Sequence, residues 1–254
     1  MMKTTLTLLA AVAIAPALHA QESYTLNSRS IAVSNSSGEI RVERGTGSSV
    51  TVCVERHGRN ADELEIETKN ENGVATLRVV HPPNQGRRFE ADADLTVRVP
   101  EGMNSVSFSS ASGDVTVVGI GSDELSAHTA SGSVTARNVR ADVLDLSTAS
   151  GSVRVEGATA ARVKAHTASG DVRVDLNGNV RDVNASTASG SIEIGVPAAF
   201  SGEVEMSTAS GDMETDFPMQ VITKRRNSLR ARIGDGSAHV ALHTASGDVR
   251  LVRR

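Results

Sequence analysis

Three histidines occupy the same position of a short word that recurs along the chain. His128, His166 and His243 each stand four residues before the glycine of a TASG word, and serine takes this position in other copies. Imidazole is a common zinc ligand, with its nitrogen about 2 Å from the metal. If successive words stack at the usual strand spacing, two layers separate His128 from His166 by about 10 Å. We therefore expect solvated surface histidines and no metal site.

Carboxylates follow the glycine directly in some copies of the word. The position holds Asp114, Asp171, Asp212 and Asp248, with serine in the other TASG and SASG copies. The GGxGxDxUx nonapeptide of calcium-binding β-rolls does not occur, so we expect surface turn carboxylates and no cofactor. Aspartate occupies this position in two consecutive copies only at Asp212 and Asp248. Elsewhere serine separates the aspartates, which limits the stacking of like charges on neighbouring coils.

One basic cluster interrupts the repeats. It consists of Lys224, Arg225, Arg226, Arg230 and Arg232. Such a cluster could bind a phosphate, an anionic lipid head group or an acidic polysaccharide, and a solvated basic loop is the alternative. These five residues are the candidate anion-binding site of the sequence.

The sequence does not indicate enzyme chemistry. Serine is frequent, but the GxSxG elbow of serine hydrolases is absent, and a serine in every repeat is typical of a corner. Polysaccharide lyases and hydrolases built on β-helices use localised acids and aromatic sugar platforms, whereas aromatic residues make up 2% of this chain. We expect a non-enzymatic protein, with a polysaccharide-active enzyme as the minor alternative.

A repeat must position all of these residues. TASG occurs six times, with related words around Ser109 and Ser34. The spacings between successive glycines are 19, 19, 19, 20, 21 and 36 residues. The glycines that define the corner are Gly113, Gly132, Gly151, Gly170, Gly190, Gly211 and Gly247, with Gly38 as an isolated earlier copy.

Apolar residues recur at fixed distances from each glycine. Positions seven before and two after are apolar in every copy. The position three before is threonine in six copies: Thr129, Thr148, Thr167, Thr187, Thr208 and Thr244. Alternation on both sides of the word predicts strands with one buried face. The buried parity changes across the glycine, which can adopt a positive φ, so a bend there would aim both strands at one interior.

These patterns predict an all-β fold, a parallel β-helix or β-solenoid with coils of about 19–21 residues. No 3.6-residue helical period is present. The core would be a thin stack of valine, leucine, alanine and threonine, and stacked threonines would contribute about 0.2–1 kcal/mol per pair.

The chain divides into three expected segments. Residues 1–20 have the basic start, apolar run and small residues of a signal peptide. Residues 21–105 would form an N-terminal strand and an antiparallel cap, with two strands joined through an Asn-Gly turn. Residues 106–254 would form the solenoid, with residues 214–238 inserted as a hairpin before a final coil.

Charge and hydropathy limit the location and the partners. The net charge is −4, which argues against non-specific nucleic-acid binding. The apolar run near the N-terminus is shorter than the roughly 20 residues needed to span a bilayer, and no other segment is as apolar. We expect an exported protein, periplasmic or secreted to the cell surface, with no membrane span after signal cleavage.

The combination of words resembles a known bacterial group. SNSSGEIRV and DLTVRVPEG precede serial SASGDVTV and TASGSVRV words, and the chain closes on GDGSAHVALHTASGDVRL. Over about residues 30–252 it is similar to candidate adhesins, or β-strand-repeat proteins of unknown function, related to head domains of auto-transporter-like adhesins. The resemblance implies an exported β-solenoid and no assigned active site.

Together these observations predict a non-enzymatic cell-envelope protein that presents stacked faces as an adhesin or binding scaffold. The alternative is a periplasmic structural or envelope-stress module that binds a protein partner. In either case the partner is an unknown envelope or surface protein or polysaccharide, and not nucleic acid.

Overall fold

The computed structural model describes residues 22–82 and 90–254, so the expected signal peptide, residues 1–20, lies outside the described residues. Within these ranges the chain forms strands and one short 3₁₀ helix, η1 (Ala61–Glu63). The strands are β1 (Glu22–Leu26), β2 (Ser30–Asn35), β3 (Ile40–Arg44), β4 (Val50–Gly58), β5 (Glu65–Glu71), β6 (Val74–Val80), β7 (Ala91–Val99), β8 (Met103–Ser112), β9 (Val115–Val118), β10 (Gly121–Ser131), β11 (Val134–Arg137), β12 (Arg140–Ser150), β13 (Val153–Ser169), β14 (Val172–Leu176), β15 (Asp182–Ser189), β16 (Ile192–Val196), β17 (Gly202–Ser210), β18 (Met213–Thr215), β19 (Gln220–Arg225), β20 (Ser228–Ile233), β21 (Ala238–Ser246) and β22 (Val249–Arg253).

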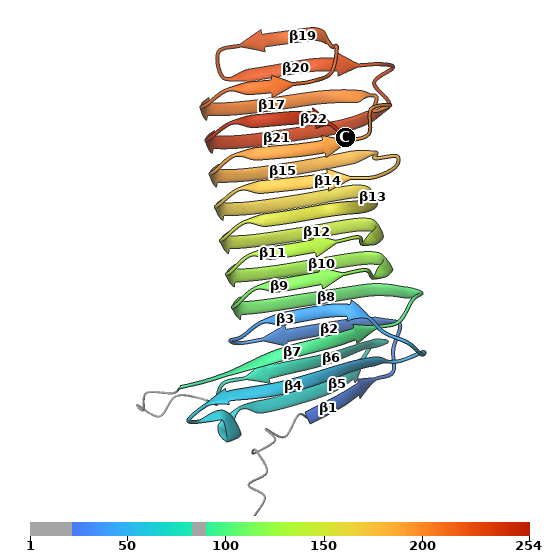
Figure 1. The fold of residues 1–254 in the computed structure, drawn as a ribbon, viewed down its shortest axis with the longest axis vertical. Coiled ribbons are helices and arrows are strands. Elements are labelled where there is room, and N and C mark those ends of the chain that lie inside the picture. Colours follow the sequence, from blue (N-terminus) through green and yellow to red (C-terminus); the bar gives the residue numbers. More distant parts are fainter. Residues whose placement is uncertain (1–21, 83–89) are drawn as a thin grey trace, which may run out of the picture.

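The strands stack into an all-β, solenoid-like body with a core between two sheets (Figure 1). We call the strands that run into the glycine corner the upstream sheet, and those that leave it the downstream sheet. Parallel pairing joins β8, β10, β12, β13, β15, β21 and β17 in the upstream sheet. The downstream sheet joins β9, β11, β13, β14, β16, β22 and β18 in the same way.

The apolar columns of the sequence become files of buried side chains. Val134 pairs with Val153 and Val153 with Val172, and each is at most 1% exposed. In β12 the buried residues alternate with exposed or half-buried ones. The predicted inward positions are therefore confirmed, and the core is one continuous cluster.

Glycine is required at the corner for two reasons. Gly151 has φ +135°, which side chains disfavour, and a Cβ there would lie 2.1 Å from the carbonyl oxygen of Gly132 in the neighbouring coil. The same approach recurs along the stack, where a Cβ added to Gly170 would lie 2.1 Å from the carbonyl oxygen of Gly151. Successive coils thus pack backbone on backbone where the chain bends.

The buried threonines bind these crowded carbonyl oxygens. Thr148 Oγ1 donates to the oxygen of Gly132 at 2.8 Å, and Thr167 Oγ1 to that of Gly151 at 2.8 Å. Each of the six threonines is 3–7% exposed. Threonine recurs because its methyl group packs in the core while its hydroxyl satisfies a buried acceptor, a stronger reason than threonine–threonine stacking alone.

The coils do not stack in chain order at the two ends, and the expectation that successive coils lie on one another is wrong there. The last coil, β21 and β22, is inserted between β15–β16 and β17–β18. At the other end β2 and β3 lie between β8–β9 and β6–β7. The C-terminal strand β22 therefore has neighbours on both sides, which protects it from fraying.

The long spacing before Gly247 is explained by a hairpin that reverses the chain. β20 pairs antiparallel with β17, placing Leu229 opposite Met206, and β19 pairs antiparallel with β20. From this outer hairpin the chain returns to fill the gap with β21. The inserted strands β19 and β20 therefore lie at the end of the stack, on the side of β17 that faces away from β21.

The N-terminal region combines both kinds of pairing. β4 is antiparallel to β1 and β7, and β5 is antiparallel to β6 through a turn at Asn72 and Gly73 with φ +53° and +78°. This is the expected Asn-Gly hairpin. β6 and β7, however, join β2 and β3 in parallel, because β2 and β3 belong to the stack itself.

Candidate binding surfaces

The histidine column runs along the outer face of the upstream sheet. Because β21 is inserted between β15 and β17, the column alternates in space from β8 to β17, in the order Ser109, His128, Ser147, His166, Ser186, His243 and Ser207. Along the chain, Ser186 and Ser207 would have been neighbours. The inserted coil thus restores a pattern that the sequence order breaks.

Each histidine bonds to one serine of the next coil. His128 Nδ1 lies 2.7 Å from Ser147 Oγ, and His166 Nδ1 lies 2.8 Å from Ser186 Oγ. His243 Nδ1 makes the equivalent contact with Ser207 Oγ at 2.7 Å. The histidines are half-buried and paired rather than simply solvated, which corrects the expectation from sequence.

Burial of the imidazole lowers the pKa of His166, and Lys164 acts in the same direction while Asp145 opposes it. The neutral ring can exchange one hydrogen bond with serine at Nδ1. Among the described residues no group of three or more histidine, cysteine or acidic side chains is placed to hold a metal ion.

A strip of exposed alanines lies beside the histidine column. The strip, two residues closer to the corner, consists of Ala130, Ala149, Ala168, Ala188, Ala245 and Ala209. Methyl groups beside a hydroxyl and imidazole file repeat at the regular spacing of the paired strands. Such a face fits an extended, regular partner better than a small molecule.

The carboxylates after the glycines have a structural role at the corner. Asp114 Oδ1 accepts the Ser133 backbone N–H at 2.7 Å, and Asp171 Oδ1 accepts that of Ser191 at 2.9 Å. Asp248 and Asp212 lie on adjacent coils, and Asp248 Oδ1 accepts the Asp212 N–H at 3.0 Å. Stacked carboxylates are therefore not avoided at this end, because a backbone donor separates them.

The structure places the five predicted anion-binding residues on one hairpin, formed by β19, β20 and the turn between them. Arg230 and Arg232 bond to Glu203 at 3.2 and 2.7 Å, which lowers the pKa of that carboxyl group. Lys224 and Arg225 lie on β19 and Arg226 in the following turn, all exposed. None of these three forms an ion pair with a described residue, whereas Arg230 and Arg232 share Glu203.

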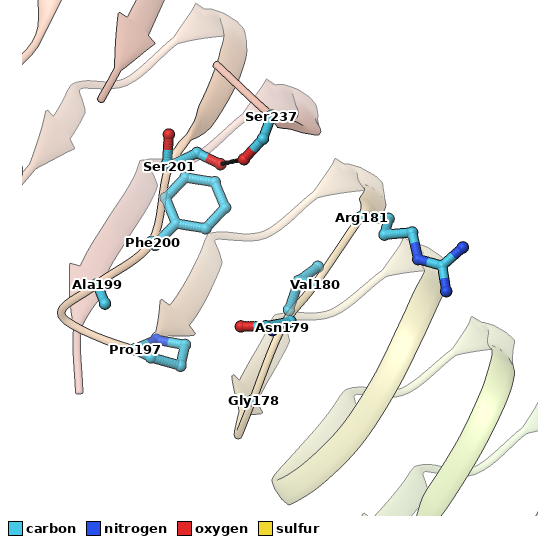
Figure 2. Close-up of a pocket in the computed structure, with 9 residues that line it drawn as sticks. All are labelled: Gly178, Asn179, Val180, Arg181, Pro197, Ala199, Phe200, Ser201 and Ser237. Carbon is cyan, nitrogen blue, oxygen red and sulfur yellow. Dashed lines mark hydrogen bonds between the residues drawn. The ribbon is translucent and has the colours of Figure 1, made fainter. Parts of the chain in front are cut away.

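A pocket of about 410 Å³ lies where the chain skips the inserted coil. Figure 2 shows Phe200 and Pro197 across from Asn179 and Val180, with the guanidinium of Arg181 directed away from Phe200. Phe200 packs edge-on against Phe217 at 5.9 Å between ring centroids, and Ser237 Oγ donates to the Ser201 carbonyl oxygen. The lining offers hydroxyl, amide and apolar contacts, with Arg181 as its one charged residue.

The family comparison covers nearly the whole stack. The model of the Toastrack DUF4097 family, a domain of unknown function, matches residues 27–252. The chain belongs to this Toastrack family. The match begins just before β2 and ends within β22, so it includes both coils that lie out of chain order.

Two solved structures are similar to the Toastrack chain over most of its length. A candidate adhesin from Bacteroides fragilis is 15% identical with a TM-score of 0.53, covering 91% of this chain and 96% of that one. A candidate adhesin from Parabacteroides distasonis is 11% identical with a TM-score of 0.47, over 91% and 96% of the two chains. The comparison with curated proteins finds no match.

Sequence reasoning missed the pocket of this Toastrack domain and the alternation of its histidine column. Both arise from the inserted coil, which the columns do not encode. The available signals were the departure from the 19-residue spacing and two of the few phenylalanines, Phe200 and Phe217, close to it. In the described part of the chain no helix has the length and apolarity to cross a bilayer.

Proposed function

We propose that this Toastrack protein is a non-enzymatic, exported cell-envelope protein that binds an extended envelope or surface polymer. The binding surface is the outer face of the upstream sheet. The observation that carries the proposal is the regular histidine–serine file beside the exposed alanine strip. The candidate adhesins with a similar fold support it as a family-level expectation.

Several finer points belong to the same proposal. Residues 1–20 act as a signal peptide, and the protein is periplasmic or displayed at the surface. The stack is a parallel β-helix with coils of 19–21 residues, supported by registers such as Val134 opposite Val153. The TASG words mark a relationship to the heads of auto-transporter-like adhesins. Fractionation with proteolysis of intact cells tests the location.

The binding proposal is tested by adding bulk to the face. We expect the purified protein to bind isolated envelope polymers, a purified polysaccharide or intact cells, and Ala149→Trp to abolish this binding. Ala149 is exposed on the strip, so the change leaves the core intact. Thr135→Trp is the matched control, because Thr135 lies on the other sheet, between Thr116 and Arg154.

Two results would overturn the proposal. One is a protein that binds none of these materials, and the other is binding that survives Ala149→Trp. Turnover of a polysaccharide by the purified protein would contradict the non-enzymatic assignment.

A second candidate function is a periplasmic structural or envelope-stress module that binds a protein partner. It is favoured by the open edge of β19, whose six residues are all exposed. Crosslinking in cells separates the two candidates, because a single protein partner supports the second and a glycan supports the first.

A further inference from the structure

The two ends of the upstream sheet carry edge strands that make no pairing on their outer side. Among the described strands, β19 is hydrogen-bonded only to β20, and β5 only to β6. Figure 1 shows β19 at one end of the stack and β5 at the other. An unpaired edge is a template for another strand, so each end needs an explanation.

β19 is unusually exposed for a strand with aliphatic residues. Val221 and Ile222 are each 51% exposed, and Met219 just before the strand is 38% exposed. Only one other large hydrophobic residue of the described chain, Val118, is exposed. An apolar, open edge strand is a typical site of strand addition.

The two edges carry opposite charge. Lys224 and Arg225 end β19 and Arg226 follows in the turn, whereas Glu65, Glu67 and Glu71 recur along β5 with one lysine between them. Within the described residues neither set forms an ion pair. Like edges therefore repel each other, and the two unlike edges attract.

The strand directions allow the unlike edges to meet. β19 is two antiparallel steps from β17 and so runs with the parallel strands of the sheet. β5 is one antiparallel step from β6, which is parallel to β2, and so runs against them. A second copy placed head-to-tail along the stack would bring β5 antiparallel to β19.

The faces of the two strands also match. Arg225 pairs with Ser228 and lies on the outer face, while Glu65 and Glu67 pair with Val80 and Arg78 and share the outer face of β5. A register that keeps the faces aligned places Arg225 opposite Glu65 or Glu67. Opposite charges across an antiparallel pair stabilise it.

We propose that this protein assembles with copies of itself head-to-tail, with β19 of one copy adding to β5 of the next in a continuous upstream sheet. The interface joins two different surfaces, so repeated addition gives filaments unless the rotation between copies closes a ring. The proposal is independent of polymer binding by the outer face, and it would multiply that face along a filament.

Reversing the charge of each edge separately tests the assembly. We expect the wild-type protein to self-associate in sedimentation velocity as its concentration rises, and less so in high salt. Lys224→Glu with Arg225→Glu, and separately Glu65→Lys with Glu67→Lys, should each raise the apparent dissociation constant by about tenfold or more. These residues lie on exposed edges, so thermal unfolding of each variant should match that of the wild type.

Mixing the two reversed variants is the decisive step. Each variant alone brings like charges together at every head-to-tail contact, whereas the mixture offers two complementary contacts and should assemble again. Arg154→Glu with Arg162→Glu is the matched control, because it makes the same charge change on exposed positions away from both edges and should assemble like the wild type.

Three outcomes would overturn the inference. A wild-type protein that stays monomeric at all concentrations has no such contact. Self-association of the β5-reversed variant alone would indicate β19 pairing with β19 around a two-fold axis. A mixture that stays monomeric would show that the charges do not form the proposed pairs.

Discussion

The middle of the stack and its two ends are built in different ways. From β10 to β14 each coil follows the previous one along the chain, and the words place equivalent residues opposite each other, as with Leu144 and Val163. At the ends, β2–β3 and β21–β22 are inserted between strands that come from elsewhere in the sequence. In the middle, the order of stacking follows the order of the chain. At each end, one coil is enclosed between strands that come from other parts of the sequence.

The difference shows what a repeated word does and does not encode. A TASG word fixes which column each residue joins, because the glycine corner and the buried threonine define the bend. It does not fix which coil lies next, since every coil presents the same columns to its neighbours. The order at the ends is set by the hairpins that turn the chain back.

The largest difference in unfolding free energy between the two regions is expected when an aspartate replaces a valine. Val172 is 1% exposed in the middle of the core, and Val172→Asp would bury an unpaired carboxylate. We expect it to lower the free energy of unfolding by more than about 4 kcal/mol, or to prevent folding. Val221→Asp on the exposed β19 should change it by less than about 0.5 kcal/mol. Urea unfolding followed by circular dichroism, with soluble yield for the first variant, checks both.

A corner glycine should be the next most sensitive position. Gly151→Ala adds a Cβ 2.1 Å from the Gly132 oxygen at φ +135°, and we expect a loss of about 3 kcal/mol from overpacking and backbone strain. Gly178 also has a positive φ, +84°, but its added Cβ would meet only Thr159 Cγ2 at 3.6 Å. Gly178→Ala should cost about 1 kcal/mol. Equal losses in urea unfolding would show that backbone approach at the corner has no special role.

These expectations explain how far the sequence alone could predict the molecule. The strand alternation, the corner and the inward threonines follow from local patterns around Gly132 or Gly151, and the structure has them as expected. The position of β21 between β15 and β17 depends on a turn-back by β19 and β20, which involves contacts distant in sequence. The pocket beside Phe200 and the histidine–serine alternation could not be predicted from the sequence either, because both depend on the position of β21.

The threonine hydroxyl should matter more in the middle than its counterpart at the N-terminal end. Thr148→Val keeps the shape but leaves the Gly132 oxygen without the 2.8 Å hydrogen bond, at a cost of about 1–2 kcal/mol. Ser110 fills the same column beside β2 and reaches the Gly38 oxygen at only 3.4 Å. Ser110→Ala should cost less than about 1 kcal/mol. Thermal unfolding of the two variants gives the ranking, and a larger loss for Ser110→Ala would contradict it.

The smallest expected effect is a difference between the two regions in how the free energy of unfolding depends on pH. Burial lowers the pKa of His166 below its ordinary value of 6.5, so the unfolded chain takes up a proton first as the pH falls. The stability associated with neutral His166 is therefore present above about 6.5 and decreases as the pH falls from there through the folded pKa. At the C-terminal end, hydrogen bonds from Arg232 and Arg230 lower the pKa of Glu203 below 4.5, so its contribution is lost only at more acid pH.

Two variants separate these contributions. His166→Asn should reduce the loss of unfolding free energy between pH 7 and pH 5, because the proton uptake of the unfolded chain at that position is removed. Glu203→Gln should leave that interval unchanged and flatten the decline only below about pH 4.5. Urea unfolding over this pH series measures both slopes. Equal slopes for wild type and His166→Asn above pH 5 would mean that the buried ring protonates as readily folded as unfolded, and that the histidine–serine file does not hold it neutral.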